Sequence, residues 1–258
     1  MRTSASSVVV LVLALLMSPL DAVAQLKVLM SGGFSGPYER LLPDFERSTG
    51  IKVSTASGAS QGTGQQTIRA QLAAGAQADV VILSREGLAD LVAAGRIAPG
   101  TETDLARTPL GIAVRAGAPK VDVGTVESFK RVVTSARSVS APGSTSGIFI
   151  REQVLPRLGI ADQVRLKTTP RGVEAAALVA AGEADLAIMP VSEIVHAPGV
   201  ELGGVLAEDI QLHQVFAAAI VAGSGQLAAA RRLIAFLASD GAAAAIRAGG
   251  REPVARRP

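Results

Sequence analysis

Four loops of the sequence combine small hydroxyl residues with glycine, each after a predicted strand and before a predicted helix. These loops are Ser31 to Ser35, Gly58 to Gly64, Pro142 to Gly147 and Pro170 to Gly172. A helix N-terminus offers unpaired N–H groups and the positive end of the helix dipole, and glycine lets a ligand approach the backbone closely. Serine and threonine add hydroxyl donors. If the loops meet, they form a donor-lined pocket for a small anion.

Each loop also has a simpler interpretation as a helix cap. Ser35, Ser84 and Ser146 could be N-cap residues, which need no ligand. Four such loops in one chain favour binding over capping, because ligands bind at the carboxyl ends of the strands in doubly wound sheets. The candidate ligand contacts that the loops themselves supply are Ser31, Phe34, Ser35, Thr145, Gly147 and Arg171.

A catalytic alternative begins at the second loop. Gly58 to Gly62 matches the G-x-S-x-G pattern of a nucleophile elbow, with Ser60 as the nucleophile. That mechanism needs an acid and a histidine further along the chain. Only His196, before an apparent turn, and His213, in an alternating strand-like run, are present. We therefore predict that the chain is not an enzyme and keep an exported serine hydrolase as an alternative.

The amino-acid composition limits the kinds of ligand, cofactor and partner that we expect. The chain has no Cys and two separated His, so we expect no metal site and no cofactor. With no Trp and one Tyr it cannot build an aromatic cage, which indicates a small, polar ligand. The net charge of +3 forms no basic stripe, so we expect no nucleic-acid partner. The cluster of Arg251, Arg256 and Arg257 is interpreted as a solvated tail.

The N-terminus has the pattern of a secretory signal peptide. Arg2 precedes an apolar run from Val8 to Met17, and Ala22 to Ala24 forms the small-x-small pattern of a cleavage site. The apolar run is about half of the roughly twenty residues that a membrane-spanning helix needs. We predict cleavage after Ala24, a periplasmic location, no membrane insertion after cleavage, and a monomer.

Strands and helices alternate along the rest of the chain. Leu26 to Met30, Ile51 to Thr55 and Asp79 to Leu83 are predicted strands, and Tyr38 to Thr49 is a predicted helix in which Pro43 should cause a kink or a delayed start. This alternation indicates a parallel, doubly wound sheet. The segment Ala73 to Ile82 then resembles Ala180 to Ile188, which favours two similar lobes over chance convergence.

Two extended segments could connect such lobes as a hinge: Leu110 to Val114 and Gln211 to Ala222. The final predicted helix, Gln226 to Ser239, would pack back on the first lobe through apolar residues such as Leu227. We predict an α/β fold of two doubly wound, Rossmann-like lobes joined by two strands. The predicted boundaries are 1–24 for the signal peptide, 25–109 plus 217–258 for the first lobe and 110–216 for the second.

The chain also resembles a known family, the molybdate-type periplasmic binding proteins of ABC importers, which have the type 2 periplasmic binding fold. The segments that carry the resemblance are Leu26 to Ser35, Phe45 to Val53, Gln71 to Ser84, Pro142 to Gly159 and Ala175 to Ile188. The resemblance implies a solute-binding protein that closes around a small anion and delivers it to a membrane permease.

In that family, backbone N–H groups and hydroxyls of both lobes hold the oxyanion without a counter-charge. Carried over by position, the contacts fall at Gly33, at Ser60, Thr63 and Gln65 of the second loop, at Ser146, at Gly172 and at Met189. The sequence departs from the pattern where Gly33 replaces a serine and Met189 replaces a tyrosine.

These departures leave the ligand open. We favour a tetrahedral oxyanion similar to molybdate or tungstate. Arg171 suits a carboxylate and makes a small di- or tricarboxylate the alternative, while the orientation of Arg85 stays open. Phosphate is less favoured, because its proton needs an acceptor and the four loops contain no Asp or Glu.

Overall fold

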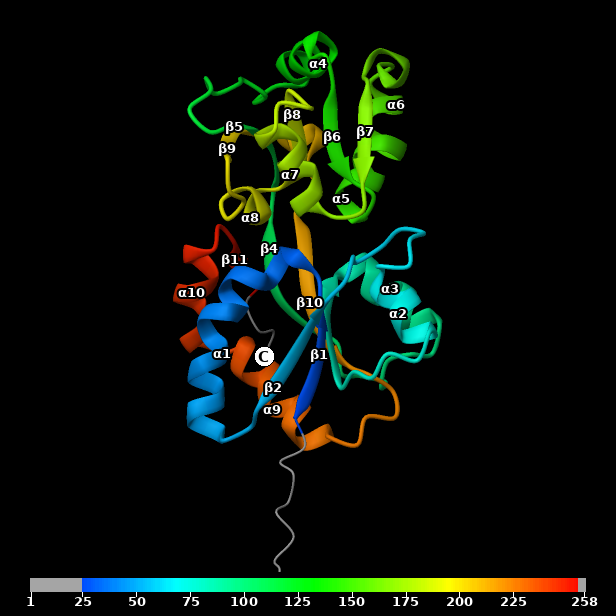
Figure 1. Cartoon of the computed structure of the whole chain (residues 1–258), viewed down its shortest axis with the longest axis vertical. Helices are drawn as coiled ribbons and strands as arrows, with labels where there is room; N and C mark the ends of the chain where they lie inside the picture. The colour runs from blue at the N-terminus through cyan, green and yellow to red at the C-terminus, as the bar shows by residue number, and fades with distance from the viewer. Residues whose placement is uncertain (1–24, 255–258) are drawn as a thin grey trace, which may run out of the picture.

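The computed structural model describes residues 25–254, so the predicted signal peptide and Arg256 and Arg257 lie outside the described residues. The described chain forms two α/β parts, one above the other in Figure 1, each built on one sheet. The first sheet has the order β11-β4-β10-β3-β1-β2 and the second the order β7-β6-β8-β5-β9. This arrangement confirms the predicted fold class, two α/β lobes joined by crossing strands.

The strands of the first sheet are β1 (Leu26–Met30), β2 (Val53–Ser57), β3 (Val80–Ser84), β4 (Thr103–Thr108), β10 (Gln214–Ile220) and β11 (Glu252–Pro253). Those of the second sheet are β5 (Leu110–Arg115), β6 (Val139–Pro142), β7 (Leu166–Thr169), β8 (Leu186–Pro190) and β9 (Val200–Val205). The helices of the first lobe are α1 (Ser35–Thr49), α2 (Ile68–Ala73), α3 (Arg85–Ala93), α9 (Leu227–Leu237) and α10 (Ala243–Ala248). Those of the second are α4 (Val126–Ser135), α5 (Thr145–Phe149), α6 (Leu155–Arg157), α7 (Gly172–Ala180) and α8 (Val191–Ile194).

Helices cover both faces of each sheet. Along β1 the side chains alternate: Val28 and Met30 pack in one apolar cluster with α1, α9 and α10, whereas Leu29 packs on the other side with α2 and α3. Strand β3 is buried along its whole length for the same reason. The second lobe likewise has one cluster that includes α4 and one that includes α7.

Two crossings join the lobes (Figure 1). Strand β4 leads through Pro109 directly into β5, and the chain returns from β9 through residues 206–213 into β10. Strand β10 runs antiparallel to β3 and β4, and β5 runs antiparallel to β8 and β9. The predicted parallel pairing is found for β1–β2, β1–β3, β6–β7 and β6–β8. The strands that carry the chain between the lobes run antiparallel to their neighbours, so each sheet is mixed.

The lobe boundaries given above remain a prediction. Strand β10 begins at Gln214, so its first residues already pair with β4 in the first sheet. Helix α1 begins at Ser35, well ahead of Pro43, so this proline does not delay the helix, which ends at Gly50 in a left-handed cap with φ of 72°. Leu227 is 48% exposed and is not a core residue.

The internal repeat lies at equivalent places in the two lobes. Asp79 precedes β3 and accepts a hydrogen bond from the Lys27 N–H at 2.8 Å, and Asp185 precedes β8 and accepts one from the Arg137 N–H at 2.7 Å. Each aspartate fastens the start of its strand to the start of a neighbouring strand. The repeat therefore has a structural role at the amino ends of the strands, opposite to the loops. Within residues 25–254, none of the helices combines the length and the apolar character that crossing a bilayer requires.

Candidate ligand-binding site

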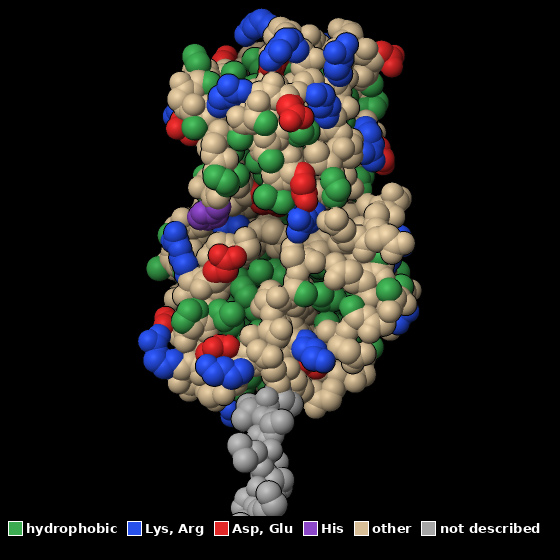
Figure 2. Space-filling view, viewed as in Figure 1, with side chains coloured by type: hydrophobic (Ala, Val, Ile, Leu, Met, Phe, Trp, Pro, Cys, Tyr) green, Lys and Arg blue, Asp and Glu red, His purple; other side chains and the backbone are tan. Residues whose placement is uncertain are grey.

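A cavity of about 270 Å³ lies between the lobes, at the carboxyl ends of strands from both sheets. The first lobe lines it with Ser31, Gly32, Ser35, Ser57, Gly58 and Ala59. The second lobe lines it with Arg171, Gly172, Val173, Met189, Ser192, Glu193, His196, Ala197 and Pro198. Figure 2 shows the waist between the lobes, where side chains of both charges lie close together. Three of the four predicted loops therefore contribute to one cavity.

Ser31 supplies a free hydroxyl to this cavity. It follows β1 directly, is 5% exposed, and its Oγ has no hydrogen-bond partner among the described residues. The neighbouring Ser35 instead donates to the Gly32 carbonyl at 2.9 Å. Buried hydroxyls in folded proteins are nearly always hydrogen-bonded, so an unpaired one beside a cavity indicates a ligand or water partner.

Arg171 lies at the mouth of the cavity, at the start of α7, and connects the lobes. Its Nη1 donates to the Ser57 hydroxyl of the first lobe at 3.1 Å. Its Nε and Nη2 both donate to one carboxylate oxygen of Glu174, at 3.1 and 2.8 Å. The side chain is 34% exposed, so the guanidinium is oriented by two partners and still accessible from the cavity.

Glu193, in α8, places a carboxyl group between the lobes. A Cβ atom on Gly172 would overlap its Oε2, and a Cβ on Gly32 would lie 3.8 Å from the same oxygen. Burial raises the pKa of this carboxyl to about 7, although the nearby Arg251 guanidinium works in the opposite direction. The cavity thus has an acid that the four loops do not supply, and the argument against phosphate given above no longer applies.

Arg251 is buried, so its interpretation as part of a solvated tail was wrong. It is 3% exposed and donates from Nε to the Gly33 carbonyl at 2.6 Å and from Nη1 to the Gly249 carbonyl at 2.5 Å. Its Nη2 reaches the Ser192 carbonyl at 3.4 Å. Burial lowers its pKa to about 10, while Glu193 raises it. The C-terminal segment thus brings a cation behind the cavity, and carbonyls of both lobes hold it there.

Ser60 belongs to a second contact between the lobes. Its Oγ accepts a hydrogen bond from the Ser84 N–H at 3.0 Å, and the Ser84 hydroxyl shares a 2.7 Å hydrogen bond with that of Thr145. Thr145 in turn donates to the Gln61 side chain at 3.0 Å. Ser84 also caps α3 by accepting from the Gly87 N–H, as its capping interpretation expected. This chain of hydroxyls holds the lobes together beside the cavity.

The hydrolase alternative finds no general base in this arrangement. His213 pairs with Glu208 at 2.9 Å outside the cavity, and the His196 ring lies against Gly36, where a Cβ would be 2.7 Å from its Nε2. None of the hydrogen bonds among residues 25–254 joins Ser60 to either histidine.

Of the remaining predicted contacts, Met189 alone is among the residues that line the cavity. Gly33 and Phe34 are buried in the first lobe, and Thr63 and Gln65 are exposed on the second loop. Ser146 and Gly147 are buried in α5. The assignment of all these residues to ligand binding remains a prediction.

Sequence reasoning missed Ser192, Glu193 and His196, which also line the cavity. The available signal was the segment after Met189 and Pro190, which repeats the strand-then-helix construction of the four loops. It was overlooked because it lacks the glycine and hydroxyl richness by which those loops were found.

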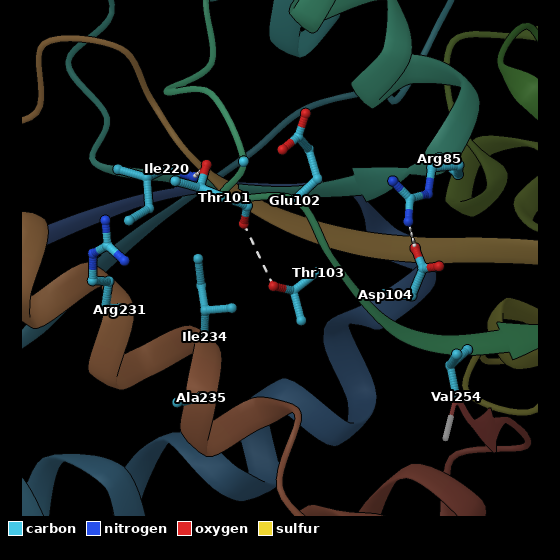
Figure 3. A pocket seen from close by; sticks show the side chains of 11 residues that line it. Arg85, Thr101, Glu102, Thr103, Asp104, Ile220, Arg231, Ile234, Ala235 and Val254 are labelled. Carbon is cyan, nitrogen blue, oxygen red and sulfur yellow. Dashed lines mark hydrogen bonds and ion pairs between the residues drawn. The ribbon is translucent and has the colours of Figure 1, made fainter. Parts of the chain in front are cut away.

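A larger hollow of about 790 Å³ lies on the first lobe alone (Figure 3). Arg85 faces this hollow and forms an ion pair with Asp104, so it does not point into the cavity between the lobes. The Thr103 hydroxyl donates to the Thr101 carbonyl at 3.4 Å. Because one lobe builds all of it, closure of the lobes cannot enclose a ligand there.

The chain belongs to the family of bacterial extracellular solute-binding proteins, whose model matches residues 26–252. Membership implies a small ligand and a membrane permease as partners. An aconitate isomerase from a Pseudomonas species is 35% identical over 237 residues, which cover 92% of this chain and 90% of that protein. That relative leaves open whether this chain is an enzyme, which the sequence analysis predicted it is not.

Solved structures support the same fold. The periplasmic molybdate-binding protein of Azotobacter vinelandii superposes with a TM-score of 0.69 at 21% identity, covering 90% of this chain and all (100%) of that chain. A periplasmic binding protein of A. tumefaciens in complex with agropinic acid gives 0.64 at 15% identity, covering 88% and 83% of the two chains. The resemblance to molybdate-type binding proteins is thereby confirmed at the level of the fold.

The close contact between Gly172 and the Glu193 carboxyl predicts that a methyl group added at position 172 lowers the stability of the protein. In Gly172→Ala, the new Cβ would overlap the Glu193 carboxyl and approach the Met189 Cε to 3.0 Å. We expect the free energy of unfolding to fall by about 1 kcal/mol, the low end of the cost of overpacking, because the atoms that the new Cβ meets are the ends of flexible side chains. Urea denaturation measures this change.

The matched control is Gly225→Ala, since no atom lies within 4 Å of its Cβ position. This variant should change stability by less than about 0.5 kcal/mol, as surface substitutions usually do. Equal stability of the two variants would contradict the close packing of Glu193 on Gly172.

Proposed function

We propose that the cavity between the lobes binds an aconitate-type tricarboxylate and that the protein interconverts its cis and trans isomers. The observation that carries this proposal is the setting of Arg171. Its guanidinium lies at the mouth of the cavity, where Glu174 and Ser57 fix its plane and take up three of its five N–H groups, so that one N–H on each terminal nitrogen is left for a ligand carboxylate. A planar guanidinium oriented in this way suits carboxylate recognition.

Two features favour a carboxylic acid over a tetrahedral oxyanion. The cavity volume of about 270 Å³ is several times the ~30 Å³ that one water molecule occupies in the liquid, which suits a branched organic ligand better than a five-atom ion. An ionised Glu193 carboxyl repels either kind of anion, but only a ligand that exchanges protons has a chemical use for this carboxyl.

The relative that is 35% identical over most of the chain supports isomerisation as the activity. Moving the double bond of aconitate requires the transfer of one proton and no electron acceptor. A donor-lined cavity between two lobes favours such a step, because fixed donors stabilise the negative charge that develops when the proton leaves.

A second candidate is a receptor that binds the same acid and delivers it to a permease. The family and the two-lobed fold favour it. Binding between lobes that close over a ligand shifts the population toward the closed form, which a permease can recognise. In either role we propose a periplasmic monomer whose lobes bear the boundaries predicted from the sequence.

The direct experiment mixes the protein with trans-aconitate and follows the ligand by ¹H NMR, with calorimetry to measure binding. The expected result is saturable binding and accumulation of cis-aconitate until the two isomers reach equilibrium. Binding without isomerisation would support the receptor. Binding of molybdate, tungstate or sulfate in place of trans-aconitate would contradict the proposal and support a tetrahedral oxyanion as the ligand.

Arg171→Ala tests the carboxylate contact. A charge-assisted hydrogen bond contributes about 1.5–3 kcal/mol, so affinity for trans-aconitate should fall by roughly 10- to 150-fold. The control is Arg85→Ala, which removes an arginine that faces the hollow of the first lobe and should leave affinity unchanged. Calorimetry distinguishes the variants, and equal affinities would rule out Arg171 as the carboxylate contact.

A further inference from the structure

Glu193 is the acidic residue that lines the cavity between the lobes. Its Oε2 lies against Gly172 of the second lobe and faces Gly32 of the first, so a ligand between these loops must touch it. None of the hydrogen bonds among the described residues involves this carboxyl, whereas Glu174 is held by Arg171. A carboxyl that is enclosed and free of fixed partners can give and accept a proton.

We propose that Glu193 is the catalytic residue that carries the proton from one carbon of the bound tricarboxylate to another. This inference rests on the proposed function, because it takes an aconitate-type ligand as the occupant of the cavity. It goes further because it assigns the proton transfer to one side chain, which lies outside the four loops identified from the sequence.

The step balances without any further reactant. The Glu193 carboxylate removes a proton from the methylene carbon of the ligand, and the electron pair spreads over the three-carbon unit and its carboxylates. Glu193 then returns the proton to the carbon that was vinylic, and the double bond moves by one position. The arrangement of the carboxylates in the bound ligand decides whether the product is cis or trans.

Charged and polar groups around Glu193 can stabilise the negative charge that develops on the ligand when the proton leaves. Arg251 behind the cavity and Arg171 at its mouth are the cations that act on the Glu193 carboxyl, and Glu174 is the opposing acid. His196, three residues further along the chain, also lines the cavity, and desolvation lowers its pKa. The buried, unpaired Ser31 hydroxyl faces the cavity from the first lobe. We assign the proton transfer to Glu193 because its carboxyl lies between Gly172 and Gly32, and we give Ser31 and the two arginines the roles of donor and charge partners.

The acidity of Glu193 suits this role. Because burial raises its pKa to about 7, the carboxyl exchanges protons near neutral pH, where a general base works best. The carboxylate form starts the reaction, so activity should increase as the pH rises through about 7 and level off above it.

Glu193→Gln tests the assignment, since it keeps the shape of the side chain and removes its proton chemistry. General acid–base groups contribute about 10²- to 10⁴-fold, so kcat should fall by at least 100-fold while affinity for trans-aconitate changes by less than about fivefold. Glu193→Asp should recover part of the rate. Glu201→Gln, at an exposed position of β9, is the matched control and should keep the wild-type rate.

The outcomes separate this inference from the proposed function. If the wild-type protein neither binds nor isomerises trans-aconitate, the proposed function fails. If the wild type isomerises and Glu193→Gln retains a rate within threefold, Glu193 is not the proton carrier and the function stands. Weaker binding in Glu193→Gln with a kcat within threefold of the wild type would make Glu193 a binding contact alone and overturn the catalytic role.

If Glu193→Gln does not fold, the pH dependence of the wild type decides. A rise in kcat/KM through pH 7 that shifts in Glu193→Asp supports the assignment. A profile without an inflection between pH 6 and about 8 overturns it, because a base with this pKa must titrate in that range.

Discussion

The arrangement of this protein depends on a partly buried carboxyl group, that of Glu193, held between two lobes. Burying an ionisable acid is unfavourable unless its charge is neutralised or compensated, and here the compensation comes from several parts of the chain. The C-terminal segment supplies the buried Arg251, and α7 supplies Arg171. Glycine at position 172 leaves the room that the carboxyl occupies. The two arginines, this glycine and the lobes thus form one unit around Glu193.

The sequence predicted the fold better than the site, for physical reasons. Alternating apolar strands and amphipathic helices such as Leu26–Met30 and Ser35–Thr49 are local patterns, and they allowed the two lobes to be foreseen. The carboxyl-end loops could be identified because glycine and hydroxyl residues mark helix starts. Arg251 could not be placed, because its burial depends on carbonyls of Gly33 and Ser192 far away in the chain. The antiparallel direction of the strands that cross between the lobes likewise has no signal in the local sequence.

The same two-lobed fold can bind a ligand or catalyse its conversion, and a few side chains in the cavity decide between the two functions. Backbone N–H groups and hydroxyls at helix starts bind an anion without changing it. Adding one acid whose pKa lies near neutrality gives the enclosed ligand a partner for proton exchange, and closure keeps water from competing for the proton. In this chain the acid is on α8, a helix of four residues directly after a buried strand. Its position is set by the rigid sheet beneath it.

The central claim is that the Glu193 carboxyl, between the lobes, titrates near neutral pH. The pKa of this carboxyl can be measured in the protein without any ligand. Uniform ¹³C labelling of glutamate allows each side-chain carboxyl to be followed by NMR as the pH changes. The account predicts one glutamate resonance with a midpoint at about pH 7, and the loss of this resonance in Glu193→Gln. If every glutamate titrated near its ordinary value, the carboxyl would be solvated, and the account of the cavity would be contradicted.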